Sequence, residues 1–578
     1  MTQQTFIKGK DSALEDSISG MMDKLDNIGI SVEQVSWLNP VPNVFSVHIK
    51  DVDCGLMFTN GKGATEKACL ASALGEYFER LSCNYFFADF YLGEEISRSD
   101  FVHYPDECWI DRDNSNFRNS VLSDKLWSFY DPEQQLSAAN LFEVNSGAGE
   151  RGVCCLPYTR QSDQQSVLFP VNIIANCYVS NGMSAGNTQN EARVQALSEI
   201  FERYVKNKII AEGLCLPDIP SEVIQRFPSI EESIRSLESH GYHLRVSDAS
   251  LGGKYPVIAV TLINPGNATV FASFGAHPCF EVALERTVTE LLQGRGLDQL
   301  DGFQSPSLDL DEVADPHNLE THFIDSSGLM SYEFFNKDPD FAFVDWDFDA
   351  DTGKEYTTLE NIIHQLDFDI YISDYQHLNV YSCRILVPGM SEIYPVDDLV
   401  WNNNNEGALL REIILSLPDQ HKDELVKLYA FLSEQGYSDF QAVAEFIGIA
   451  PDPGSVWSEL RIGELKAMIC LAIDHHDSAE WVDWCLHLDQ LSPDRHQLYH
   501  CLSVLLELDI QQQNKLEISL NQLFGKQRFE QCKKIIRGEI TFAGLHSPGL
   551  SLQGFELHQK LLDGYLKLQA MKNNKASS

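Results

Sequence analysis

A helical segment with two glutamates and an arginine occurs twice in this chain, each time after a glycine-containing loop. "ALGEYFER" ends at residue 80 and "ALSEIFER" ends at residue 203. A third stretch, "FGAHPCFEVALERTVTELLQGRG" (274–296), repeats the order of strand, loop and helix. Residues three or four apart are neighbours on a helix, so each helix presents aligned polar side chains. Three such units predict a mixed structure in which strands and helices follow one another.

The rest of the pattern divides the chain into two parts. Residues 1–400 are expected to form an α+β domain, and residues 401–578 an all-α domain, with "WNNNNEG" (401–407) as the boundary. Residues 86–165 are interpreted as an irregular insertion. Strands are expected at 44–51, 54–60, 171–180, 255–265, 269–276, 369–375 and 379–388, and helices at 66–84, 189–208, 230–241 and 279–294.

Helical patterns dominate the chain beyond residue 407. Gly463 and His496, which open comparable helices, lie 33 residues apart. This spacing is close to the tetratricopeptide period, so tetratricopeptide-like helical hairpins are expected. A plain helical bundle is the alternative.

Charge and cysteine content restrict the classes of function. The formal net charge is −43 and the pI is about 4.6. Such a surface repels phosphate backbones, which argues against direct nucleic-acid binding and against attachment to an anionic membrane surface. The 14 cysteines are never spaced as CxxC, and the N-terminus lacks the apolar core of a signal peptide. We therefore expect a cytoplasmic protein without a zinc site or disulfides.

Convergence of the three helices would bring many carboxylates together. Like units commonly pack side by side on one sheet, and we expect that arrangement here. Two carboxylates ~4 Å apart repel by roughly 4 kcal/mol at an effective dielectric of ~20. Three arginines (Arg80, Arg203 and Arg286) are too few to balance the glutamates, so Mg²⁺ joined to substrate phosphates is the natural supplement. The alternative is a solvent-exposed helix face with Glu–Arg pairs.

Other metal and nucleotide sites fit the sequence less well. A di-iron carboxylate site uses Glu-x-x-His pairs, whereas both copies here have Glu-x-x-Glu. The chain has no GxxxxGK[ST] motif, and "NGKGAT" (60–65) is at best a weak phosphate-binding loop. A nucleotide could still bind through carboxylates and Mg²⁺ without a P-loop.

The combined motifs resemble the ATP-binding motifs of the YcaO family. The match consists of Ser72-x-x-x-Glu76-x-x-Glu79-Arg80, Gln195-x-x-x-Glu199-x-x-Glu202-Arg203 and Arg286-x-x-x-Glu290. The resemblance covers the whole chain, including its helical C-terminal part. It implies a YcaO-type α+β domain with an ATP site whose glutamates hold Mg²⁺ against the phosphates.

The resemblance also implies roles for individual residues. One Mg²⁺ would be bound by Glu76, Glu199 and Glu290, and another by Glu79, Glu191 and Glu202. The implied nucleotide contacts are Lys10, Ser17, Ser72, Ser184, Asn187, Gln195, Arg203 and Arg286. Ser12 and Glu15 are instead interpreted as a helix capping box. No catalytic residue is assigned.

The end of the chain bears on the kind of activity expected. Azoline-forming members of the family phosphorylate a peptide amide oxygen and end in PxPxP, whereas this chain ends in "AMKNNKASS". The resemblance therefore implies an accessory role, in which ATP binding and hydrolysis assist a RimO-like methylthiotransferase acting on an aspartate of a small-subunit ribosomal protein. A homodimer is expected through the helical part. The alternatives are an enzyme that activates peptide amides and a non-catalytic nucleotide-binding scaffold.

Overall fold

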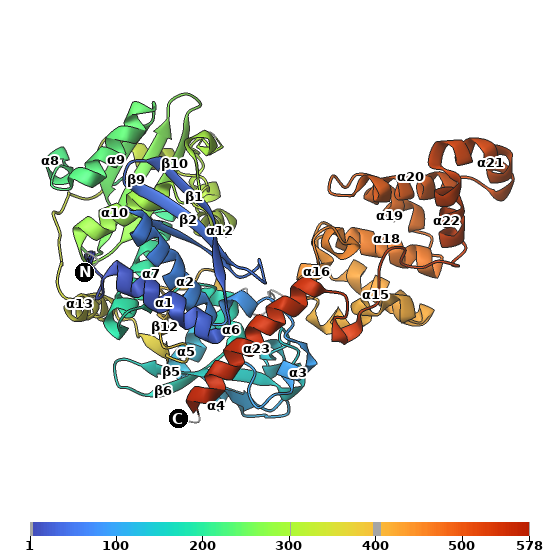
Figure 1. Cartoon of the computed structure of the whole chain (residues 1–578), viewed down its shortest axis with the longest axis horizontal. Coiled ribbons are helices and arrows are strands. Elements are labelled where there is room, and N and C mark those ends of the chain that lie inside the picture. Colours follow the sequence, from blue (N-terminus) through green and yellow to red (C-terminus); the bar gives the residue numbers. More distant parts are fainter. Residues whose placement is uncertain (1–3, 301, 397–405, 577–578) are drawn as a thin grey trace.

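The fold contains three antiparallel sheets (Figure 1). It is given by a computed structural model that describes residues 4–300, 302–396 and 406–576. The first sheet has the order β1 (Val32–Val41), β2 (Val44–Asp51), β3 (Phe58–Gly63), and the second the order β10 (Thr269–Ala276), β9 (Val257–Asn264), β8 (His243–Asp248). The third has the order β4 (Cys108–Ile110), β5 (Val153–Arg160), β11 (Tyr371–Tyr375), β12 (Tyr381–Leu386), β7 (Met183–Gly186), with β6 (Ser166–Pro170) paired to β5.

The three repeated units are confirmed as strand, loop and helix, but each belongs to a different sheet. They are β3 with α2 (Glu66–Ser82), β7 with α7 (Gln189–Glu212) and β10 with α10 (Phe280–Leu291). The expectation of one shared sheet is therefore wrong. The helices still converge, because each packs on the strand of another unit: α2 on β7, α7 on β10 and α10 on β3.

Glycine in each of these strands allows its own helix to approach closely. A Cβ atom on Gly61 of β3 would lie 2.2 Å from the backbone oxygen of Cys69 in α2. A Cβ on Gly186 of β7 would lie 2.8 Å from the backbone nitrogen of Ala192 in α7. The third unit has Gly275 close to α10 in the same way. Because glycine has no side chain at these positions, each of the three helices can pack close to the backbone of its strand.

Most of the expected strands are present, and one is wrong. The strand predicted at 269–276 is β10, and the helices predicted at 66–84 and 279–294 are α2 and α10. Residues 171–180 instead begin as a helical turn, α6 (Val171–Ile173), and continue as a π-helix over Ile174–Tyr178. This apolar segment is buried on several sides, so its hydrophobicity shows no period that distinguishes strand from helix.

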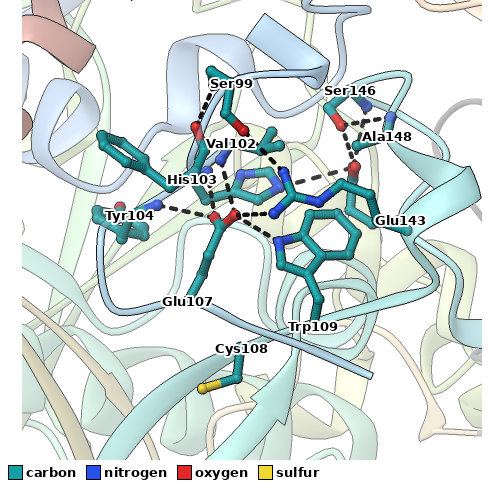
Figure 2. A network of polar contacts seen from close by, with 12 residues as sticks. Ser99, Val102, His103, Tyr104, Glu107, Cys108, Trp109, Glu143, Ser146 and Ala148 are labelled. Carbon is teal, nitrogen blue, oxygen red and sulfur yellow. Dashed lines mark hydrogen bonds and ion pairs between the residues drawn. The ribbon is translucent and has the colours of Figure 1, made fainter. Parts of the chain in front are cut away.

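Residues 86–165, expected to be an irregular insertion, contain short helices and strands, and their buried side chains belong to cores shared with other parts of the chain. The region contains α3 (Gly93–Ser97), β4, α4 (Phe117–Ser120), α5 (Asp124–Tyr130) and β5. A carboxylate organises one of its loops: Glu107 accepts hydrogen bonds from the backbone N–H of Val102 at 2.8 Å and of His103 at 2.6 Å, and from Nε1 of Trp109 at 2.6 Å (Figure 2).

Among the described residues, further helices pack around the three units. Of these, α1 (Leu14–Ile28) packs on α2, α9 on α10, and α11, α12 and α13 on α7. The remaining bounds are α8 (Ser221–Ile224), α9 (Pro228–Ser239), α11 (Leu310–Val313), α12 (Pro316–Ile324) and α13 (Thr352–Gln365).

The described residues beyond 405 are helical, as expected. Successive contacts join α15 to α18, α18 to α19, α19 to α20 and α20 to α22 in a series that projects from the α+β part (Figure 1). The tetratricopeptide-like character of this series stays a prediction. The bounds are α14 (Arg411–Leu415), α15 (Lys422–Glu434), α16 (Val443–Phe446), α17 (Val456–Glu459), α18 (Ile462–Ile473), α19 (Ser478–Cys485), α20 (Pro493–Glu507), α21 (Ile510–Phe524) and α22 (Lys526–Ile536).

The last helix, α23 (Glu556–Ala576), returns to the α+β part (Figure 1). Its buried residues Leu561, Tyr565 and Leu568 belong to the same core as α1 and α2. Residues 401–405 of the predicted boundary lie outside the described residues. The division into domains 1–400 and 401–578 stays a prediction. The last helix of the second range, α23, packs against the first range.

Candidate functional site

A cavity of about 1210 Å³ lies where α2, α7 and α10 converge, and we call it the central cavity. The N-terminal segment and α1 cover part of it. All fourteen residues assigned from the sequence line this cavity: Lys10, Ser17, Ser72, Glu76, Glu79, Ser184, Asn187, Glu191, Gln195, Glu199, Glu202, Arg203, Arg286 and Glu290. The three helices thus bring together side chains that are far apart in the sequence.

Carboxylates dominate one end of the central cavity. Burial, together with the nearby charge of Glu199, holds the pKa of Glu79 well above its usual range. Burial also raises the pKa of Glu199, although Arg203 opposes the shift. Both carboxylates would therefore be stabilised in their charged form by an additional cation.

Cations of the protein are paired with the carboxylates at this end. Arg80 contacts Glu76 at 2.9 Å and Arg203 contacts Glu199 at 2.7 Å, both one turn apart on their helices. Lys62 of β3 forms an ion pair with Glu290 of α10. Burial lowers the pKa of Lys62 to about 8, against the opposing effect of Glu202 and other glutamates around it.

The cations of the cavity are more numerous than the sequence indicated. Ten carboxylates line the cavity, the six predicted metal ligands among them, and they are accompanied by nine cationic side chains: Lys8, Lys10, Lys24, Lys62, Arg80, Arg203, Lys206, Arg286 and Arg295. The expectation that three arginines are the counter-charges of the glutamates is therefore incomplete, because it overlooked the lysines and Arg295. Lys62 lies in "NGKGAT", between the two glycines that face α2; that position was the signal that could have revealed it.

The other end of the cavity lies at the start of α7. The side chain of Asn187 donates to Glu191 at 2.9 Å and accepts from Oγ of Ser17 at 2.8 Å. Lys10 lies 3.4 Å from Glu191, whose pKa is lowered because Lys10 and several hydrogen-bond donors outweigh its burial. These contacts connect α7 to the N-terminal segment and to α1.

The predicted capping box at Ser12 and Glu15 is wrong. The N-cap of α1 is Ala13, without a side-chain capping bond. Glu15 instead accepts hydrogen bonds from Thr5 and forms an ion pair with Lys67 at 2.6 Å. These partners are distant in sequence, so the local pattern could not indicate them.

The grouping of Glu191 with Glu202 around one ion is also wrong. Both residues belong to α7, which is one continuous helix of 24 residues. Eleven residues of helix separate them by about 16 Å along the axis, at 1.5 Å per residue. Two carboxylates so far apart cannot bind the same ion, whereas Glu199 and Glu202 lie on the same turn.

The carboxylates are oriented toward protein cations, not grouped around a single point. Among the described residues, the group of three possible ligand atoms within 4.8 Å of one another is His475, His476 and Asp477, in the helical part. The assignment of individual glutamates to metal ions therefore stays a prediction.

The donors in the central cavity nevertheless fit Mg²⁺ and a nucleotide. Mg²⁺ requires hard oxygen ligands, and it commonly binds one or two carboxylates together with substrate phosphates. The carboxylate end supplies oxygen donors from three helices, and two of these carboxylates, Glu79 and Glu199, have raised pKa values. Guanidinium groups, the usual partners of phosphates, lie beside them at Arg203 and Arg286.

Within the part of the chain that the structure describes, none of the helices has the length and apolar character that a transmembrane segment needs.

Two family models match the chain. One, described as YcaO cyclodehydratase, ATP- and Mg²⁺-binding, matches residues 60–391. The other, described as the YcaO cyclodehydratase C-terminal domain, matches residues 407–574.

Two curated proteins are similar over nearly the full length. The ribosomal protein S12 methylthiotransferase accessory factor YcaO of Escherichia coli is 54% identical over 98% of this chain and 99% of its own. An uncharacterized protein of Haemophilus influenzae is 52% identical over 99% of both chains. Among solved structures, YcaO from Methanopyrus kandleri bound with AMPPCP and Mg²⁺ is 18% identical, with a TM-score of 0.42 over 68% of this chain and 95% of that one.

Proposed function

The chain belongs to the YcaO family, and from that premise we propose that it is an accessory factor for methylthiolation of ribosomal protein S12 that binds ATP with Mg²⁺. The 54% identity to an accessory factor of this name, over 98% of the chain, supports the proposal. The observation that carries the nucleotide site is the convergence of α2, α7 and α10 on one cavity with carboxylates from all three helices.

The carboxylate end would hold the metal and the phosphates. We assign Glu76, Glu199 and Glu290 to one Mg²⁺, as the sequence predicted, and Glu79 with Glu202 to a second. When bound, Mg²⁺ supplies positive charge that offsets the charge of the phosphate oxygens.

The remaining residues of the cavity would bind and orient the nucleotide. Arg203 and Arg286 would donate hydrogen bonds to phosphate oxygens, and Arg286 is already oriented by a 2.9 Å hydrogen bond to Gln195. At the opposite end, the assigned residues are Lys10, Ser17, Asn187 and Glu191, which contact one another. Glu191 lies there, away from the two metal sets, so we assign it to the nucleotide end. Ser72 and Ser184 line the cavity between these groups.

Partners and location follow from the same proposal. The partner enzyme would be a methylthiotransferase of the RimO type, and the substrate of that enzyme would be the ribosomal protein. Because ribosomal proteins are modified in the cytoplasm, we assign this protein to the cytoplasm. Assembly as a homodimer is part of the proposal and is supported by the apolar residues Ile510, Ile518 and Leu523, which are exposed on α21. Light scattering of the purified protein tests it.

Reconstituted methylthiolation tests the function. Ribosomal protein S12 is incubated with the methylthiotransferase and its cofactors, with and without this protein and Mg-ATP, and the modified aspartate is measured by mass spectrometry. The accessory role predicts more product with the protein than without it, and less with a Glu199→Gln variant than with the wild type. The amide-activating alternative predicts loss of water from a peptide with no methylthiotransferase present, and the scaffold alternative predicts stimulation without ATP turnover.

A further inference from the structure

The lysine of the first unit lies on the opposite side of its strand from the two glycines beside it. Successive side chains of a strand point to opposite faces. Gly61 and Gly63 face α2, since a Cβ atom on either would collide with the backbone of that helix. Lys62 therefore faces away from α2, toward the central cavity, where it meets Glu290 of α10.

Lys62 differs from the other cations of the carboxylate end in how it is held. Arg80 stacks on the ring of Tyr85 at 4.2 Å and pairs with Glu76 of its own helix. Arg203 likewise lies over Phe323 at 4.7 Å and pairs with Glu199. These guanidinium groups are fixed by aromatic rings.

The second buried lysine of the cavity is engaged elsewhere. Lys206 donates to the backbone oxygen of His322 at 2.6 Å and to Oγ of Ser326 at 3.3 Å. It therefore holds the segment after α12, while Lys62 pairs with a carboxylate assigned to the metal. The side chain of Lys62 is 24% exposed and that of Glu290 is 32% exposed, so both can change partners within the cavity.

We propose that Lys62 is a built-in counter-ion that competes with the divalent metal for Glu290 and, once displaced, turns to the phosphates of the nucleotide. The inference rests on the proposed ATP and Mg²⁺ site and concerns the same cavity. The charges of Glu202, Glu76 and Glu199 also act on the Lys62 ammonium, against the repulsion of Arg286, so Lys62 stabilises carboxylates of all three units. A metal ion alone must displace that charge, whereas a metal with a nucleotide gives the ammonium a new anionic partner.

Manganese binding to a Lys62→Met variant tests the proposal. Mn²⁺ substitutes for Mg²⁺ as a probe, and electron paramagnetic resonance separates the free ion from the bound ion in the full-length protein. The matched control is Lys67→Met, which removes a lysine that is 55% exposed and paired with Glu15 outside the cavity. Circular dichroism checks that each variant is folded.

The expected changes have opposite signs for metal and nucleotide. Lys62→Met should bind Mn²⁺ alone at least fivefold more tightly than the wild type, and should bind Mg-ATP at least fivefold more weakly by calorimetry. Lys67→Met should match the wild type in both. In the Lys62→Arg variant the guanidinium group pairs more strongly with a carboxylate, so this variant should bind Mn²⁺ more weakly than the wild type. It is the test to use if Lys62→Met does not fold.

The result that overturns the proposal is distinct from failure of the proposed function. If wild-type protein binds Mg-ATP but removal of the lysine leaves Mn²⁺ affinity unchanged or lower, Lys62 is not a competitor for the metal site. If the wild type binds no Mg-ATP at all, the proposed function itself is wrong.

Discussion

Lys572 of the last helix donates a hydrogen bond to the side-chain oxygen of Asn84, which is 488 positions earlier in the chain and two residues beyond the end of α2. The ammonium also lies 4.3 Å from the ring centre of Tyr104 and donates to the backbone oxygen of His103 at 2.8 Å. Burial holds the pKa of Lys572 well below its usual range. The end of the chain is thus part of the structure that positions α2, and through α2 the glutamates of the central cavity.

Removal of the α23 contacts should destabilise the α+β part. Tyr565 is fully buried in the core of α1 and α2 and its hydroxyl donates to the backbone oxygen of Val102. Tyr565→Ala should cost about 3–5 kcal/mol of unfolding free energy, as large-to-small changes in cores do. Leu308→Ala, at a position that is 88% exposed and away from α21, is the control and should change stability by less than about 0.5 kcal/mol. Urea unfolding measures both; equal stabilities would mean that α23 only rests on the surface.

A chain that ends near residue 400 should consequently fail as an independent domain. It lacks α23, so the partners of Leu561, Tyr565 and Leu568 in the shared core lose their cover. We expect an aggregated or partly unfolded product by light scattering and circular dichroism. A well-folded fragment with the unfolding cooperativity of the full chain would show that the first part does not need the last helix.

A side chain at Gly61 should disrupt the first unit, because β3 and α2 lie too close together at this position to accommodate one. Gly61→Ala places a methyl group 2.2 Å from the backbone oxygen of Cys69, so α2 must move and carry Glu76 and Glu79 with it. We expect loss of several kcal/mol of stability, together with weaker Mg-ATP binding. Gly75→Ala on α2 itself meets nothing within 4 Å and should raise stability by up to about 1 kcal/mol, as expected for alanine in a helix. Thermal unfolding of the two variants should therefore shift in opposite directions.

The pH dependence of stability should include a contribution from Glu355. Burial, with a smaller contribution from the charges of Asp349, Asp11 and Asp351, raises the pKa of this α13 carboxyl to about 7. The unfolded chain releases the proton near 4.5, so the folded state loses stability as pH rises from about 4.5 to 7 and the full cost remains above 7. Glu355→Gln should be more stable than the wild type by up to about 3 kcal/mol at pH 8 and by little at pH 4.5.

Unfolding in urea at both pH values measures this difference. Glu360→Gln, on the same helix, is the control, and its stability difference should not vary with pH in this way. A Glu355→Gln variant whose gain is the same at pH 4.5 and pH 8 would contradict the assigned shift.

The sequence predicted the helices of the site better than the way they assemble. Spacing of Glu76 and Glu79, and of Glu199 and Glu202, specifies faces of α2 and α7, because helix geometry is local. The sheet that each unit joins depends on contacts between distant segments, so placing β3, β7 and β10 in one sheet was wrong. Lys62 was missed for the same reason: its partner Glu290 is more than two hundred residues away. The packing of α23 near Asn84 could not be predicted either, because the contacting residues are 488 positions apart and no local sequence pattern relates them.

A single carboxylate of α7 should be needed for nucleotide binding but not for folding. Glu199→Gln keeps the shape of the side chain and removes the charge assigned to Mg²⁺, so Mg-ATP should bind on the order of 100-fold more weakly, or about 3 kcal/mol. Glu212→Gln, at the exposed end of the same helix where Glu212 pairs with Lys208, should bind as the wild type does. Calorimetry compares the three proteins, and wild-type affinity in Glu199→Gln would remove Glu199 from the metal ligands.

The dependence of ATP binding on Mg²⁺ is the direct test of a nucleotide site in which glutamates bind the metal. ATP is a polyanion and must enter a cavity lined by glutamates, while Mg²⁺ alone must compete with the protein cations paired to them. Each ligand supplies what the other lacks, so their binding should be strongly and reciprocally coupled. At a ligand concentration about 100 times the dissociation constant, binding adds ~2.7 kcal/mol to the free energy of unfolding. Thermal unfolding should therefore shift upward with Mg-ATP, and much less with ATP plus a chelator or with Mg²⁺ alone; equal shifts for chelated ATP and Mg-ATP would contradict a carboxylate-bound metal site.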